Sequence, residues 1–273
     1  MKTLGAVQAA LWASSVCFSS CGLRALSRPV VGALSAGRFR MAAIGRRDLV
    51  LSVAGAFSHA GEPGGAVGWG IVGLGDVCAV KAGPAFVKAE GSALVAVMRR
   101  TPGAAEVWAK RNVPGGNCRG YSDLDAFLAD PAVDAVYICT PPGSHLEIAR
   151  KVAAARKPCY IEKPMGRSAT EAEQIVSVFE QHNLPLFSAY TSRAFERTAA
   201  VRRLLATGAV GAKVTHITYI CRGPGLVRGL QPTSGGSNAE ENEPHLPWRL
   251  VASQSGGGLV MDVGCHLLDR LGM

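Results

Sequence analysis

The chain lacks most of the features that mark membrane, metal-binding and disulfide-stabilised proteins. No uninterrupted apolar run reaches the roughly 18 residues that a membrane-spanning helix needs, so we expect no membrane span. Eight cysteines are present, but no two form a CxxC pair, and neither a zinc site nor a disulfide framework is indicated. Hydrophobic residues occupy 48% of the 273 positions, which predicts a chain that buries a core rather than a disordered one.

Acidic residues are absent from positions 1–47, and this absence explains most of the net charge of +9. The segment holds seven basic residues, whereas the rest of the chain has 22 basic and 20 acidic ones. A body with nearly balanced charge offers no positive face to a polyanion. We therefore expect no nucleic-acid partner.

The same N-terminal region predicts a targeting segment. Residues 4–18 form an apolar stretch behind Lys2, and the Arg-, Ser- and Ala-rich stretch that follows is typical of transit peptides. Arg46 and Arg47 precede an apolar run and add a twin-arginine-like element. We expect residues 1–61 to direct import into the plastid, including its lumen, with the mitochondrion as the alternative destination. The other interpretation is an amphipathic N-terminal helix of the mature domain. Residues 62–66 are interpreted as a linker.

A predicted strand and a glycine turn open the folded part. Residues 67–72 form a short apolar run, Gly73-Leu74-Gly75 follows, and residues 76–90 are compatible with a helix. Such a turn lets the backbone approach a pyrophosphate at the N-terminus of the helix. Cys78 replaces the third glycine of the GxGxxG pattern, so the match is incomplete. The predicted phosphate-binding residues are Gly73, Leu74, Gly75, Asp76 and Val77.

Further strands and helices alternate along the chain. Residues 93–98 and 133–139 are predicted strands, residues 103–111 a helix, and Ser122 the cap of another helix that ends near Asp130. This alternation predicts an α/β fold, with a doubly wound parallel sheet of the Rossmann type over residues 67–187. The nucleotide is expected at the carboxyl ends of the strands.

The end of the second predicted strand bears on the choice of cofactor. An NAD-preferring site usually places an acidic residue about 20 positions beyond the glycines, where it binds the ribose hydroxyls. Here the chain has Arg99 and Arg100 instead, and two guanidinium groups favour a 2′-phosphate. We predict NADP, with NAD as the alternative, because the two arginines can also be solvated loop residues.

Two motifs behind the later strands resemble a known family. The runs YICTPPGSH at 137–145 and YIEKP at 160–164 are similar to those of the glucose-fructose oxidoreductase, inositol dehydrogenase and rhizopine catabolism family, Gfo/Idh/MocA. The resemblance implies that Lys163 faces the nicotinamide and the substrate, with a cis bond before Pro164. It places Thr140, Pro141 and His145 beside the cofactor, and Glu162 against the nicotinamide ribose or the lysine. Without the resemblance, Lys163 is a strand-end cation that can simply pair with Glu162.

A second motif follows three glycines at 256–258. Asp262 and His266 are four positions apart, a spacing that puts both on one face of a helix, so the carboxylate could orient the imidazole. The resemblance places this pair opposite Lys163, with His266 as the acid or base. The alternative is an ion pair that only stabilises a helix. No third residue with suitable spacing completes a metal site, and none is predicted.

Residues 188–273 are predicted to form part of an α+β substrate domain. The linking helix begins at the capping box Ser168-x-x-Glu171 and runs to about His182. A strand over 185–190, a helix over 195–207, a strand over 213–221 and a loop over 223–246 follow. The resemblance implies that this domain supplies the substrate pocket and a homo-oligomer interface. Because the chain stops where the sheet of the family continues, we expect a truncated domain.

These observations together predict an NAD(P)-dependent oxidoreductase. Its partner would be a small molecule, and the resemblance implies a sugar, a polyol or a related carbonyl compound. Lys163 would bind the reacting oxygen, His266 would exchange its proton, and Asp262 would position His266. The alternative is a nucleotide-binding module without turnover, either regulatory or part of an assembly.

Overall fold

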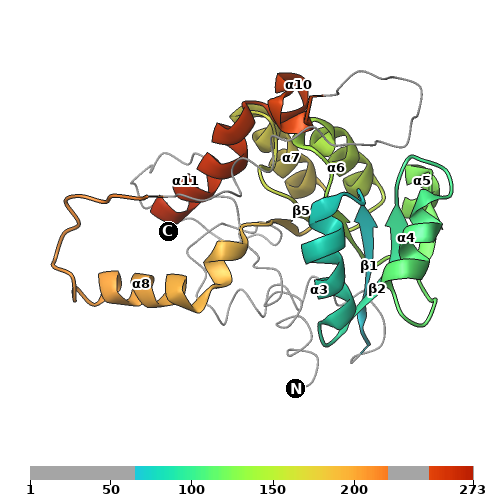
Figure 1. Ribbon diagram of the computed structural model, residues 1–273, viewed down its shortest axis with the longest axis horizontal. Helices are drawn as coiled ribbons and strands as arrows, with labels where there is room; N and C mark the ends of the chain where they lie inside the picture. Colours follow the sequence, from blue (N-terminus) through green and yellow to red (C-terminus); the bar gives the residue numbers. More distant parts are fainter. Residues whose placement is uncertain (1–64, 221–245, 273) are drawn as a thin grey trace, which may run out of the picture.

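The computed structural model describes residues 65–220 and 246–272 and confirms the predicted parallel sheet (Figure 1). Six strands pair in the order β3-β2-β1-β4-β5-β6, and every pair is parallel. The strands are β1 (Val67–Val72), β2 (Ser92–Met98), β3 (Arg119–Tyr121), β4 (Ala135–Ile138), β5 (Cys159–Ile161) and β6 (Leu186–Ser188). The strand order reverses between β1 and β4, and such a switch point leaves a crevice at the carboxyl ends.

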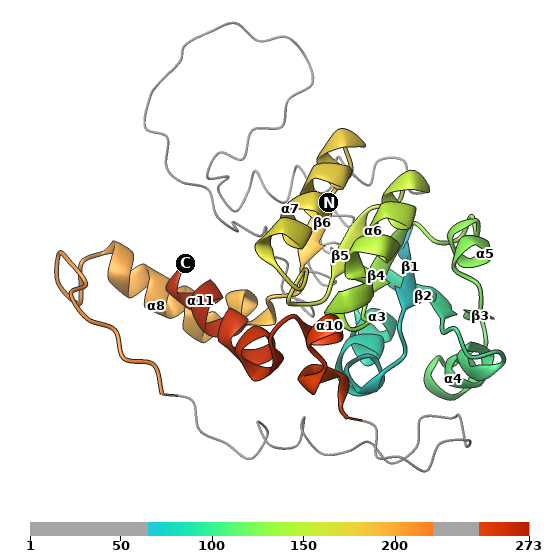
Figure 2. The ribbon, with the colours of Figure 1, turned by 90° about the horizontal axis from the view of Figure 1, so that it is seen from above.

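Helices cover both faces of the sheet. Those of the Rossmann part are η1 (Cys78–Ala82), α3 (Gly83–Lys88), α4 (Ala104–Asn112), α5 (Leu124–Leu128), η2 (Pro142–Ser144), α6 (His145–Ala154) and α7 (Ala169–Gln181). Figure 2 shows α6 and α7 on one side of the strands and α3 on the other. Each face has its own core, around Phe127, Ile175 and Phe179 on one side and Phe86 and Tyr137 on the other. A sheet covered on both faces needs strands that are apolar throughout, as β4 is.

Two helix starts differ from their predictions in detail. The helix predicted to begin at Ser122 begins at Leu124, because the Asp123 carboxylate accepts the Ala126 N–H at 2.7 Å and caps it. Ser168 caps α7 as predicted, through the Glu171 N–H. The second hydrogen bond of a capping box, from the Ser168 backbone N–H to the Glu171 side chain, is absent. Glu171 instead accepts the backbone N–H of Arg167 at 2.8 Å and pairs with its guanidinium.

Beyond β6 the chain leaves the sheet. The elements are η3 (Thr191–Ala194), α8 (Glu196–Ala206), η4 (Trp248–Leu250), α10 (Ala252–Ser255), η5 (Val260–Gly264) and α11 (Cys265–Leu271). In both ribbon views α8 and α11 lie at the end of the molecule away from α4 and α5 (Figures 1 and 2). No residue of α8 is buried.

The prediction of a strand over 213–221 is wrong for residues 213–220. These residues form no strand and are exposed throughout. Their alternating pattern is real, but a strand also needs a neighbour to accept its backbone hydrogen bonds, and none pairs with this segment among the described residues. Cys221, the loop predicted over 223–246 up to residue 245, the predicted targeting segment and the predicted linker up to residue 64 lie outside the described residues. No helix in the described part of the chain has the length and apolarity required to cross a bilayer.

Candidate active site

A pocket of about 680 Å³ lies along the carboxyl ends of β1, β2, β4 and β5. Most of the residues predicted from the sequence to bind cofactor or substrate line it, namely Gly73, Leu74, Gly75, Asp76, Val77, Arg99, Arg100, Thr140, Pro141, Glu162, Lys163 and Asp262. His145 and His266 are not among the lining residues. The strand ends and the segment 246–272 therefore bring together positions up to 189 residues apart in the chain.

The glycine turn has the geometry that a close phosphate approach requires. Gly73 has φ +99°, and a Cβ there would lie 2.8 Å from Thr140 Cγ2 and 2.9 Å from the Cys139 carbonyl. Only glycine adopts this backbone without strain. A Cβ at Gly75 would meet no atom within 4 Å, so the backbone at this position is open to the pocket.

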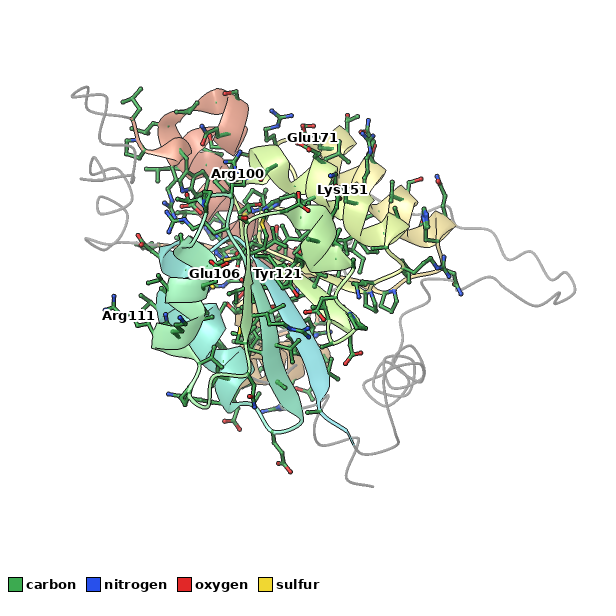
Figure 3. All side chains as sticks on the ribbon, turned by 90° about the vertical axis from the view of Figure 1, so that its right-hand side faces the viewer. Arg100, Glu106, Arg111, Tyr121, Lys151 and Glu171 are labelled. Atoms are coloured by element: carbon green, nitrogen blue, oxygen red, sulfur yellow. The ribbon has the colours of Figure 1, made fainter. Side chains whose placement is uncertain are left out.

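The other end of the pocket carries positive charge. Arg99 and Arg100 follow β2, both are exposed, and both line the pocket. Figure 3 shows Arg100 beyond the upper, carboxyl ends of the strands. An open glycine turn at one side and two guanidinium groups at the other fit a dinucleotide, with an extra phosphate at the arginines. No group of three or more His, Cys, Asp or Glu that could hold a metal ion occurs within 65–220 and 246–272.

Glu162 orients the backbone at the end of β5. Its Oε1 accepts the Tyr137 hydroxyl at 2.6 Å, and its Oε2 accepts the Lys163 backbone N–H at 3.0 Å. Burial raises the pKa of this carboxyl, against the opposing effect of those hydrogen bonds and of the Lys163 charge. The Lys163–Pro164 bond is cis, as the resemblance implied. The direct pairing of Glu162 with the lysine ammonium is absent, because that ammonium turns to Asp262.

Lys163, Asp262 and Arg249 form one charge cluster. Lys163 Nζ donates to Asp262 Oδ1 at 2.7 Å and to the Asp262 backbone oxygen at 2.9 Å. Arg249 Nε donates to Asp262 Oδ2 at 2.8 Å. Burial alone would raise the pKa of Asp262, but the charges and hydrogen bonds of the two cations outweigh it and lower the pKa. Asp262 is therefore an ionised bridge between two cations.

The predicted orientation of His266 by Asp262 is not seen. Both carboxylate oxygens of Asp262 are taken by Lys163 and Arg249. The spacing argument assumed a regular α-helix, whereas Asp262 lies in the π-helical turn η5 and His266 in α11. The wider π turn changes which residues share a face.

His266 nevertheless lies next to the cluster. Its ring packs edge-on against Tyr190, with 6.0 Å between centroids. Burial, followed by the Lys163 and Arg270 charges, lowers the pKa of His266 to about 4. The imidazole is therefore neutral at physiological pH and able to accept a proton.

His145 was predicted to lie beside the cofactor, but its side chain is buried and does not line the pocket. The ring is fully buried, with Nε2 2.8 Å from the Thr140 carbonyl and Nδ1 3.1 Å from the Met165 carbonyl. Burial lowers its pKa. The histidine links the loops after β4 and β5, which is a structural role that no local pattern distinguishes from a cofactor contact.

The segment 246–272 is held over the strand ends by close backbone contacts. Gly256 has φ +80°, and a Cβ there would lie 2.4 Å from the Arg167 carbonyl oxygen. Arg167 Nη1 also donates to the Ser253 carbonyl at 2.7 Å. Further along, Arg193 Nε donates to the buried Asp269 carboxylate at 2.6 Å. These contacts place Arg249 and Asp262 at the pocket.

Sequence reasoning missed Arg249, Trp248 and Tyr137 as site residues. Trp248 and Arg249 line the pocket, and the guanidinium lies over the indole at 4.4 Å from the ring centroid. The available signal for Arg249 was the adjacent pair Trp248-Arg249, in which the arginine lies 13 positions before Asp262. Tyr137 lies within the apolar β4 and offered none.

Comparisons with known proteins agree with this arrangement. Residues 67–190 match the model of an oxidoreductase family with an NAD-binding Rossmann fold, GFO_IDH_MocA. The chain is 32% identical over 205 residues to an oxidoreductase of Formosa agariphila, covering 75% of this chain and 59% of the relative. It is 25% identical over 208 residues to a 1,5-anhydro-D-fructose reductase of Ensifer adhaerens, covering 74% and 55%.

A solved structure of an aldose-aldose oxidoreductase from Caulobacter crescentus has the same fold, with a TM-score of 0.57 and 24% identity over 76% of this chain and 56% of that one. The chain thus spans little more than half the length of these proteins. The glycine turn, the strand-end lysine and the family match identify residues 67–190 as the NAD-binding Rossmann part of the Gfo/Idh/MocA family of oxidoreductases.

Proposed function

We propose that the protein is an NAD(P)-dependent oxidoreductase that acts on the alcohol or carbonyl group of a sugar, polyol or related compound. The observation that carries the proposal is the position of Lys163, whose ammonium is fixed by Asp262 in the pocket that the glycine turn opens. The names of relatives, such as the 1,5-anhydro-D-fructose reductase, support the substrate class. When bound, the nicotinamide would give or take the hydride.

The charge cluster suits a developing negative oxygen. The Lys163 ammonium has three N–H donors, and Asp262 takes two of them. Among the described residues the third has no partner, so it is available to a substrate oxygen. The neutral His266 would accept the hydroxyl proton during oxidation and return it during reduction. Asp262 would position Lys163 rather than His266.

Cofactor binding is the first test. The full chain is titrated with NADPH and with NADH, following nicotinamide fluorescence and the melting temperature, which a ligand of the native state raises. We expect saturable binding with a preference for NADPH, followed by oxidation or reduction in a screen of sugars and polyols. A folded chain that binds neither nucleotide would refute the proposal. One that binds without any turnover would favour a binding module.

The double variant Arg99→Ala/Arg100→Ala should lose affinity for NADPH. Without two charge-assisted hydrogen bonds to the 2′-phosphate, the Kd for NADPH is expected to rise about 10- to 100-fold, while the Kd for NADH changes by less than roughly twofold. Arg111→Ala removes an exposed charge on α4, away from Arg100 in Figure 3, and is the matched control. Equal losses for both nucleotides would rule out a 2′-phosphate contact.

The low pKa of His266 predicts an unusual pH dependence. A base with a pKa of about 4 stays unprotonated through the range in which an ordinary histidine titrates, so kcat/KM for oxidation should keep its value down to pH 5 and fall near pH 4. His266→Gln should lower kcat/KM at neutral pH and remove its decrease near pH 4.

Stability provides a second readout for His266. Between pH 6.5 and 4 the unfolded chain binds a proton at this residue that the native state does not, so the free energy of unfolding decreases as the pH falls through that window. The variant His266→Gln should show a shallower decrease. If kcat/KM of the wild type instead fell near pH 6.5, the assignment of His266 as a base of low pKa would be contradicted.

A further inference from the structure

We propose that Arg249 is a positioning residue for the reaction: it holds the Asp262 carboxylate so that one oxygen, and only one, engages Lys163. The inference rests on the proposed function for its kinetic part. Its structural part concerns the contacts among three side chains and can be measured without cofactor or substrate.

The contacts of Arg249 fix its guanidinium from two directions. Its Nε donates to Asp262 Oδ2 at 2.8 Å, and the guanidinium carbon lies 4.4 Å from the centroid of the Trp248 ring. The Arg249 side chain is 24% exposed and that of Asp262 16%, so their pair is screened from water on most sides. A planar guanidinium held on a ring face and by a carboxylate has little freedom to reorient.

The division of the carboxylate between two cations has a chemical consequence. With Oδ2 taken by Arg249, Asp262 presents a single oxygen to Lys163, at 2.7 Å. The three side chains then carry a net charge of +1, whereas Asp262 and Lys163 alone would be neutral. A net positive cluster stabilises the negative charge that develops on a substrate oxygen, and a fixed carboxylate keeps the ammonium aimed at that oxygen.

Arg249 also connects the site to the segment that carries it. It lies in η4, Asp262 in η5 and Lys163 at the end of β5, so the cluster joins three separate elements. Gly256, between η4 and η5, packs against the Arg167 backbone. Asp262 is thus anchored on both sides, by the Rossmann part through Lys163 and by the preceding turn through Arg249.

The test compares Arg249→Gln, Asp262→Asn and the double variant. We expect Arg249→Gln to lower kcat about 10- to 100-fold with a smaller change in KM, because the reacting geometry is disturbed more than ground-state binding. If Arg249 acts through Asp262, the double variant should be no slower than Asp262→Asn alone. Arg249→Lys should recover part of the activity. Arg202→Gln on the exposed face of α8 is the control with an unchanged kcat. Additive losses would overturn the inference.

The rate of Lys163 acetylation in the cofactor-free protein, followed by mass spectrometry, separates this inference from the proposed function. A lysine held by a fixed carboxylate reacts slowly, so Arg249→Gln and Asp262→Asn should both accelerate acetylation. If Arg249 were merely a nearby cation, its removal would slow acetylation instead, and the inference would be wrong. The acetylation rates can be interpreted even if the wild-type chain shows no turnover. If Arg249→Gln fails to fold, Arg249→Met provides the same comparison, because it also removes the charge.

Discussion

Replacing Lys163 by methionine is expected to lower turnover by about 100- to 1,000-fold, the usual effect of removing one donor to a developing oxyanion. Cofactor affinity should change little, because the phosphate turn after β1 and the arginines after β2 are left intact. The fold should also persist. Asp262 keeps its ion pair with Arg249 when the ammonium is lost, so no buried carboxylate is left without a cation.

Two further variants serve as comparisons for Lys163→Met. Lys163→Arg retains the charge but not the geometry of a three-donor ammonium, and it should recover only a small part of the activity. Lys88→Met at the exposed end of α3 removes one lysine elsewhere and should behave as wild type. The measurements are kcat under saturating substrate and Kd for the nucleotide. Undiminished turnover in Lys163→Met would exclude the lysine from the chemistry, and a parallel loss of nucleotide binding would assign it to the cofactor site.

The two glycines of the phosphate turn should respond in opposite ways to alanine. At Gly73 a Cβ meets Thr140 and the Cys139 backbone within 2.9 Å, and φ is +99°, so Gly73→Ala should cost about 2 to 4 kcal/mol of stability. At Gly75 a Cβ meets nothing within 4 Å, so Gly75→Ala should leave stability unchanged. It should instead weaken nucleotide binding about 10- to 100-fold, because the methyl group occupies the space that a phosphate would approach.

Chemical denaturation and nucleotide titration of both variants test this contrast. Gly103→Ala is a useful third variant, since Gly103 also has a positive φ, +74°, but open space around it. Its loss of stability isolates the cost of the backbone conformation, about 1 kcal/mol. If Gly75→Ala binds NADPH as well as the wild type does, the pyrophosphate does not lie on this turn.

The parallel sheet and most of the pocket could be predicted because local sequence carries them. Apolar runs of four to seven residues specify buried strands, the Gly73 to Gly75 turn specifies a backbone that only glycine allows, and parallel strands gather their carboxyl ends at one edge. The roles of His145 and Asp262 could not be predicted in the same way. A histidine after a strand has the same local appearance whether its ring faces a cofactor or two buried carbonyl groups.

The sequence by itself therefore determined the fold type, the position of the phosphate turn and the strand-end lysine, because each depends on residues that are adjacent or spaced by one structural period. Only the tertiary structure decided the partner of Asp262. Lys163 and Asp262 are 99 positions apart, and their contact depends on how the segment 246–272 packs across the strand ends, with a π turn altering the register that the helical spacing implied. Contacts of that kind follow from the closure of the whole chain and leave no periodic trace in the sequence.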